Sequence, residues 1–128
     1  MQTGEPHLRV LVVDDSDAVR RGLTRLLRPQ AGIEIIDEAS DGQDAIRKAL
    51  QHKPDVVLMD VSMPVMNGLE AARTIKHHLP STVILMVTQF ESASFAREAV
   101  SAGATGYILK SEAPEELIPA LRKIQSSK

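Results

Sequence analysis

The chain has 128 residues, which is enough for one ordinary domain but not for a second. Its 25% of charged residues and net charge of -2 are those of a soluble, folded protein, and they argue against DNA binding by this chain alone. The chain has no Cys, which excludes disulfides and thiolate metal sites. No apolar run reaches the roughly 18 residues of a membrane span, so we expect a cytoplasmic protein without a membrane partner.

Short apolar runs alternate with helical patterns along the chain. The runs that predict strands are 10–13, 33–36, 56–59, 83–87 and 107–109. Each is followed by apolar residues at helical spacing: Val19, Leu23, Leu26 and Leu27; Ile46, Ala49 and Leu50; Leu69, Ala72 and Ile75; Phe95, Ala99 and Val100; Leu117, Leu121 and Ile124. Residues 1–7 predict a short disordered leader, 8–125 the domain, and 126–128 a polar tail or the start of a linker.

Strict alternation of strand and helix predicts a doubly wound α/β fold. Each helix carries the chain back, so neighbouring strands run parallel and helices cover both faces through right-handed crossovers. For a five-stranded open sheet the common strand order is 2-1-3-4-5, as in flavodoxin-like folds. Ligands bind where the order reverses, at the carboxyl ends of the first and third strands.

Compatible side chains follow four of these strands. They are Asp14 and Asp15 after the first strand, Asp60 after the third, Thr88 after the fourth and Lys110 after the fifth. Three carboxylates in one crevice need cations, and Lys110 together with Mg²⁺ would supply them. A hydroxyl, an ammonium and a metal around a third carboxylate suit phosphoryl transfer, with Asp60 as the nucleophile. The acids after the second strand, Asp37 and Glu38, are interpreted as solvated surface because that strand lies at the outer edge.

From residue 8 to 125 the sequence resembles the receiver domain of two-component response regulators. The resemblance rests on Val12-Val13-Asp14-Asp15, on Met59-Asp60 with Met63-Pro64 and Gly68, on Thr88, and on Gly103-Ala104 before Tyr107-Ile108-Leu109-Lys110. It implies that a sensor histidine kinase or phosphotransfer protein phosphorylates Asp60. It also implies that Asp14, Asp15, Asp60 and the main-chain carbonyl of Ser62 bind Mg²⁺. Thr88 and Tyr107 would be the switch residues, and Lys110 would pair with the phosphoryl group.

Within that family the segment from Gly106 to Lys110, with Pro114 to Leu117, is most similar to the NarL/FixJ-type regulators. Such regulators commonly carry a carboxyl-terminal helix-turn-helix and regulate transcription. The resemblance leaves open whether this chain is a stand-alone receiver or the receiver half of a longer protein. The fourth helix, fifth strand and fifth helix are expected to form the surface for dimerisation or effector contact.

Gln89 and Phe90 follow Thr88 where many receivers place a small residue and a more open rim. We expect the amide of Gln89 and the ring of Phe90 to lie over the mouth of the site and to slow the entry of small phosphodonors and of water. Phosphorylation by small donors should then be slow and phospho-Asp60 long-lived.

Other functional classes explain the sequence less well. Asp15-Ser16-Asp17-Ala18-Val19 matches the signature of haloacid dehalogenase-type phosphatases, but that reading leaves Asp60 and its Met-Pro loop unexplained. An FMN binder would need a Gly- and hydroxyl-rich first loop and aromatic residues, whereas this loop is acidic and the chain has no Trp. A receiver used only as an interaction module would not need the acids, the threonine and the lysine of the site, and all of them are present in this sequence. We therefore expect a phosphoacceptor module rather than an enzyme.

Overall fold

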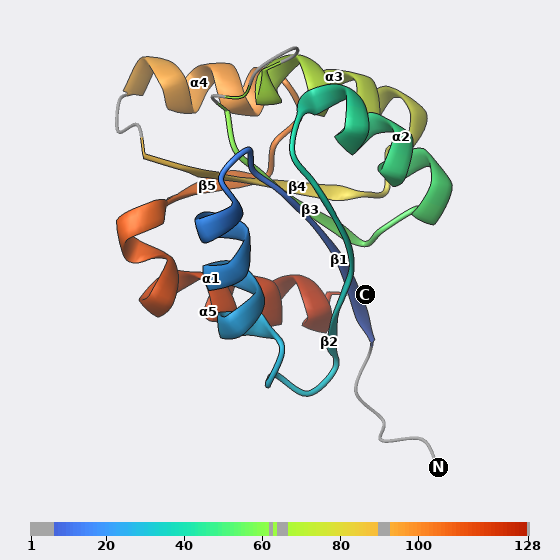
Figure 1. Ribbon diagram of the computed structural model, residues 1–128. Helices are drawn as coiled ribbons and strands as arrows, with labels where there is room; N and C mark the ends of the chain where they lie inside the picture. The colour runs from blue at the N-terminus through green and yellow to red at the C-terminus, as the bar shows by residue number, and fades with distance from the viewer. Residues whose placement is uncertain (1–6, 62, 64–66, 90–92, 128) are drawn as a thin grey trace.

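The computed structural model describes residues 7–61, 63, 67–89 and 93–127. Its parallel sheet has the order β2-β1-β3-β4-β5 and lies between two layers of helices (Figure 1). The strands are β1 (Leu8–Val13), β2 (Ile33–Ala39), β3 (Val56–Met59), β4 (Val83–Thr88) and β5 (Gly106–Leu109). The helices are α1 (Asp17–Leu27), α2 (Gly42–His52), α3 (Gly68–His78), α4 (Ala93–Ser101), the short 3₁₀ helix η1 (Lys110–Glu112) and α5 (Ala113–Ser126). The predicted doubly wound fold and strand order are confirmed.

The sheet separates two hydrophobic cores, because its central strands are buried on both faces. Figure 1 shows α2, α3 and α4 on one face and α1 and α5 on the other. The core under α2, α3 and α4 is built around Met59, Ile75 and Met86. The core under α1 and α5 is built around Leu27, Leu117 and Leu121. Within the described ranges, none of the helices has the length and apolar character needed to span a bilayer.

Polar residues fix the starts of the helices that face the site. The Ser16 hydroxyl accepts a hydrogen bond from the Val19 N–H at 3.2 Å and caps α1. The Asn67 side chain accepts from the Glu70 N–H at 3.0 Å and caps α3. The connections after β1 and before α3 are therefore set by local chemistry at the edge where the strands end.

The strand registers bring the carboxyl ends of the strands to one edge of the sheet. Val13 at the end of β1 pairs with Met59 at the end of β3, and Met59 pairs in turn with Met86 in β4. Thr88 at the end of β4 pairs with Leu109 at the end of β5. The residues that follow these positions therefore share this edge.

β2 is longer than the sequence predicts, and its two acids, which lie on the outer edge strand as predicted, are partly exposed but also paired. The strand continues to Ala39, so Asp37 and Glu38 lie within it. Asp37 Oδ2 lies 3.0 Å from His52 Nε2, and Asp37 Oδ1 lies 3.5 Å from Lys48 Nζ. Glu38 Oε1 accepts a hydrogen bond from the Nε of an arginine in α1, Arg20, at 3.1 Å. These acids are paired with cations from both helix layers.

The end of α5 is fastened to the connection between α1 and β2. Arg122 Nη1 donates to the Ala31 carbonyl oxygen at 2.8 Å, and Arg122 Nη2 donates to Gln30 Oε1 at 3.2 Å. The buried Gln125 donates from Nε2 to the Gly32 carbonyl oxygen at 3.1 Å. These bonds hold the last helix against a segment that comes early in the chain.

Candidate acidic site at the carboxyl edge of the sheet

Asp14 is a buried acid that is held in place by its neighbours. It is 1% exposed, and its N–H donates to the Ala39 carbonyl oxygen of β2 at 3.1 Å. Its Oδ1 accepts a hydrogen bond from the Ser16 N–H at 2.9 Å, which turns the chain from β1 into α1. The next residue, Asp15, is exposed. The turn thus presents one buried and one exposed carboxylate.

Asp60 completes a cluster of three carboxylates. It follows β3, is 4% exposed, and donates its N–H to the Val13 carbonyl oxygen at 3.0 Å. Asp14, Asp15 and Asp60 each offer a carboxylate oxygen, and these oxygens lie within 4.8 Å of one another. Hard oxygen donors at this separation fit a divalent cation such as Mg²⁺. The arrangement can therefore bind a hard metal ion.

Lys110 brings the positive charge to this cluster. Its Nζ lies 2.9 Å from Asp14 Oδ2 and 3.6 Å from Asp60 Oδ1. Burial lowers the pKa of Lys110, but the hydrogen bond to Asp14 and the charges of Asp60 and Asp14 raise it by more than burial lowers it. The pKa of Lys110 therefore lies above its ordinary value. The side chain is therefore a persistent cation between two buried acids.

Thr88 and Tyr107 lie on the two strands beyond Asp60. Thr88 is the last residue of β4 and is fully buried. Tyr107 in β5 is half-buried and packs against the core under α2, α3 and α4. Gln89 is exposed directly after Thr88. Three residues with roles predicted from the sequence lie outside the described residues. They are Ser62, predicted to bind metal through its main-chain carbonyl, Pro64 in the predicted loop, and Phe90, predicted to gate the site.

Comparison with known proteins identifies the chain. The family model described as the response regulator receiver domain matches residues 10–122. The chain belongs to this family. The receiver domain is 45% identical over 115 residues to the uncharacterized transcriptional regulatory protein YxjL of Bacillus subtilis (strain 168), covering 90% of this chain and 53% of YxjL.

Two solved structures resemble this receiver domain closely. A LuxR family two-component response regulator from Aurantimonas sp. SI85-9A1 has a TM-score of 0.89 at 36% identity, covering 95% of this chain and 87% of that one. The signal receiver domain of the response regulator NarL from Mycobacterium tuberculosis has a TM-score of 0.89 at 28% identity, covering 96% and 99% of the two chains. The receiver domain spans about half the length of the curated relatives it matches.

Membership of this family gives the receiver domain its general function. It is a phosphoacceptor switch of two-component signal transduction, and the predicted resemblance to receiver domains of the NarL type is confirmed. Neither the phosphatase reading based on Asp15 nor the FMN-binding reading is supported by these matches.

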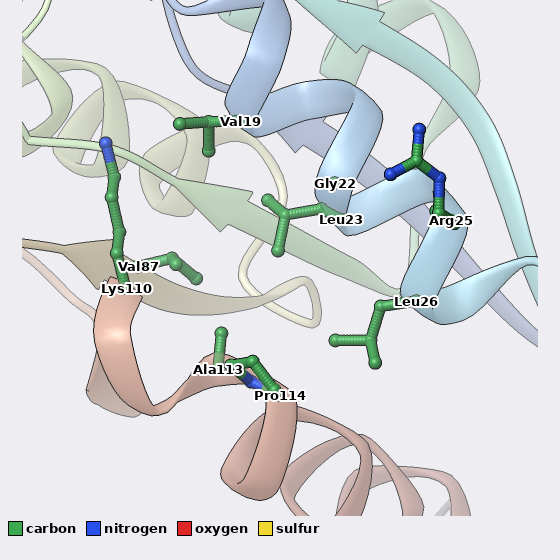
Figure 2. Close-up of a pocket in the computed structure, with 9 residues that line it drawn as sticks. All are labelled: Val19, Gly22, Leu23, Arg25, Leu26, Val87, Lys110, Ala113 and Pro114. Atoms are coloured by element: carbon green, nitrogen blue, oxygen red, sulfur yellow. The ribbon is translucent and has the colours of Figure 1, made fainter.

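A cleft that the sequence did not indicate opens beside Lys110. It has a volume of about 530 Å³ and is lined by Val19, Gly22, Leu23, Arg25, Leu26, Val87, Lys110, Ala113 and Pro114. Figure 2 shows Leu23 and Leu26 of α1 on one side and Ala113 and Pro114 of α5 on the other. The apolar spacing along α1 predicted a core face, but Val19 and Leu26 are only half-buried because they line this cleft.

Arg20 was also missed by sequence reasoning. It is one of several arginines in and just after α1, and its side chain is 15% exposed, whereas Arg21, Arg25 and Arg28 are exposed. Its position directly after Val19, at the edge of the apolar stripe, is the signal that separates it from Arg21 and Arg25.

Proposed function

We propose that Asp60 is the residue of this receiver domain that accepts the phosphoryl group. The observation that supports this most is the position of Lys110, whose ammonium lies 2.9 Å from Asp14 and 3.6 Å from Asp60. Asp60 is next to the cation as well as to the acid pair, and it follows the strand beside that of Thr88. A phosphoryl group on Asp60 would therefore meet a cation and a hydroxyl already supplied by neighbouring strands.

We further propose that the acids bind Mg²⁺. Asp14, Asp15 and Asp60 would hold it together with the main-chain carbonyl of Ser62, which lies outside the described residues. The bound ion would neutralise charge on the transferring phosphoryl oxygens. The donor set of hard oxygens supports Mg²⁺ over softer metals, because this chain has no Cys and the described cluster includes no His.

The proposed reaction is a transfer between two side chains. A carboxylate oxygen of Asp60 forms a bond to phosphorus while the bond from phosphorus to a histidine nitrogen of the donor breaks, and that nitrogen keeps the electron pair. The donor would be a sensor histidine kinase or a phosphotransfer protein in the cytoplasm. The receiver domain would promote its own phosphorylation and dephosphorylation without acting as an enzyme on other substrates.

The proposed output surface consists of α4, β5 and α5. Phosphorylation adds about -1.5 to -2 charge, toward which Thr88 and Lys110 would move, and Tyr107 would follow. A nearly complete switch needs about 5.5 kcal/mol, which two or three charge-assisted hydrogen bonds of about 1.5–3 kcal/mol each can supply. Val100 on α4 is 63% exposed and offers apolar area for a dimer or effector contact. The name of YxjL supports transcription as the process controlled.

Mass spectrometry after incubation with acetyl phosphate and Mg²⁺ tests the proposal without knowledge of the kinase. The wild-type chain should gain one phosphoryl group, and Asp60→Asn should not. Asp55→Asn is a matched control at the opposite end of β3, where the carboxylate accepts a hydrogen bond from the Arg9 N–H at 2.8 Å. It should retain the gain, because an asparagine oxygen can accept that bond.

A gain of mass in Asp60→Asn would place the nucleophile elsewhere, with Asp15 as the first candidate. Chelation of Mg²⁺ should abolish the gain in the wild type. Asp14→Ala and Asp15→Ala should instead raise the Mg²⁺ concentration required.

A further inference from the structure

The guanidinium of Arg20 joins three segments of the chain. Nη1 donates to the main-chain oxygen of Asp14, in the turn after β1. Nε donates to Glu38 Oε1 of β2 at 3.1 Å, and Nη2 pairs with Asp17 in the first turn of α1. Because the guanidinium is planar and rigid, three bonds in different directions fix its orientation.

The oxygen that Arg20 contacts belongs to the peptide that joins Asp14 to Asp15. This peptide is planar, so holding its oxygen restricts the direction in which the chain continues to Asp15. The Asp14 side chain is already fixed by the Ser16 N–H and by Lys110. The contact from Arg20 therefore acts mainly on the relative placement of the two neighbouring carboxylates.

Glu38 anchors Arg20 to the sheet. Glu38 is part of β2, and its carbonyl oxygen accepts a hydrogen bond from Lys48 of α2. Its N–H donates to Asp37 Oδ1 at 2.8 Å. The main chain of Glu38 is thus held from the α2 side, while its side chain holds Arg20 on the α1 side. The partner Asp17 is 73% exposed, so its ion pair contributes little to this anchoring.

We propose that Arg20, anchored by Glu38, is a positioning residue that sets the Asp14–Asp15 peptide for divalent-cation binding. This inference rests on the proposed function, in which these acids hold Mg²⁺. A role by charge alone predicts the opposite effect, because removing a cation near three carboxylates strengthens their attraction for a metal ion. The sign of the change in affinity therefore separates positioning from simple electrostatics.

Direct titration of the full unphosphorylated chain with Mn²⁺, followed by electron paramagnetic resonance, tests the inference without a phosphorylation assay. Arg20→Lys keeps the positive charge but loses the planar set of N–H donors, and Arg20→Ala loses both the charge and the donors. Each should weaken Mn²⁺ binding about tenfold, the effect typical of residues that orient metal ligands. Glu38→Gln should weaken it by a smaller factor, because the amide still accepts from Arg20. Arg21→Lys, on the exposed neighbour, should leave the Kd within twofold of wild type.

The outcomes separate this inference from the proposed function. Failure of the wild-type chain to bind Mn²⁺, or binding that survives Asp15→Ala and Asp60→Asn unchanged, overturns the metal site and this inference with it. Wild-type binding with an unchanged Kd in Arg20→Lys, or a tighter Kd in Arg20→Ala, overturns only the positioning role. Circular dichroism establishes that each variant is folded at the titration temperature. If both Arg20 variants unfold, a Glu38→Gln variant with wild-type affinity overturns the role by itself.

Discussion

Gly68 lies against the main chain of Asp60 with no room for a side chain between them. A Cβ at Gly68 would lie 2.0 Å from the Asp60 carbonyl oxygen. The Gly68 N–H donates to the Val61 carbonyl oxygen at 2.8 Å, which holds the first turn of α3 beside this segment. The start of α3 thus sets the position of the peptide that follows the proposed phosphoacceptor.

Gly68→Ala is therefore expected to destabilise the domain by about 1–3 kcal/mol, the usual cost of an overpacked site. The contact is with backbone, which cannot move aside as a flexible side chain would. Gly22→Ala is the matched control, because a Cβ at Gly22 meets nothing within 4 Å and Gly22 lies inside α1. That change should stabilise the domain by about 0.5–1 kcal/mol. Urea unfolding of both variants measures the two effects, and equal stabilities would contradict the close approach.

The proposed output surface can be mapped with beryllofluoride, a mimic of the phosphoryl group. NMR shift changes should extend beyond the site to residues 95–100 and 107–121. Thr88→Ala should confine them to the neighbourhood of Asp60, because the proposed coupling passes through the Thr88 hydroxyl. Changes confined to the site in the wild-type chain would show that α4, β5 and α5 do not respond.

Gating by Gln89 and Phe90 predicts two separate rate effects. Gln89→Ala should speed phosphorylation by acetyl phosphate, because it removes a long exposed side chain next to Thr88. Phe90→Glu should shorten the life of phospho-Asp60, because a carboxylate can position a water for attack. Each effect should be several-fold, since about 1.4 kcal/mol in a barrier is tenfold in rate. Ser81→Ala, before β4, is the control, and changes below twofold in the first two variants would refute gating.

The cluster around Asp37 predicts a pH-dependent contribution to stability. Burial raises the pKa of Asp37, but hydrogen bonds from the Glu38 N–H, His52 and Lys48 and the charge of Lys48 lower the pKa more, to below its ordinary value of 3.8. A lowered pKa means that the stabilisation is present above pH 3.8 and is lost as the pH falls through the pKa of the folded state. Lys48 also pairs with a second acid, since its Nζ lies 3.3 Å from Asp44 Oδ2.

Asp37→Asn should therefore lower the free energy of unfolding at pH 7 and approach the wild type in acid. The expected difference is below about 1 kcal/mol, because the Asp37 side chain is 35% exposed to screening solvent. Thermal unfolding from pH 7 downward measures it, with the exposed Glu98→Gln on α4 as the control. A difference that grows as the pH falls would contradict the assigned sign.

Most of the fold was predictable because the strands are short apolar runs buried on both faces. Val56–Met59 matches its prediction at both ends, since Asp55 and Asp60 flank it. The end of β2 was not predictable in this way, because two acids at the end of an edge strand indicate solvated surface, and their pairing with Lys48 and Arg20 depends on the packed helices. The 3₁₀ helix η1, which begins at Lys110, is too short to show a helical period.

The site was predictable to the extent that topology alone assembles it. Parallel strands carry Asp14, Asp60 and Lys110 to one edge, so their convergence follows from the strand order. The contacts of Arg20 do not follow from topology, because its position at the edge of the apolar stripe of α1 does not show which acceptors lie beside it. The need for Gly at position 68 was also hidden, since it depends on how closely α3 approaches Asp60.

The bonds from α5 to the connection between α1 and β2 have a consequence for the order of folding. Arg122 and Ala31 are 91 residues apart, and Gln125 and Gly32 are 93 residues apart. During synthesis on the ribosome, the early segment therefore emerges long before its partners. Until Leu117 and Leu121 follow, the core that they complete stays open on one side. The final loop closures come with α5, so both faces of the sheet are covered only once α5 has been synthesised rather than strand by strand.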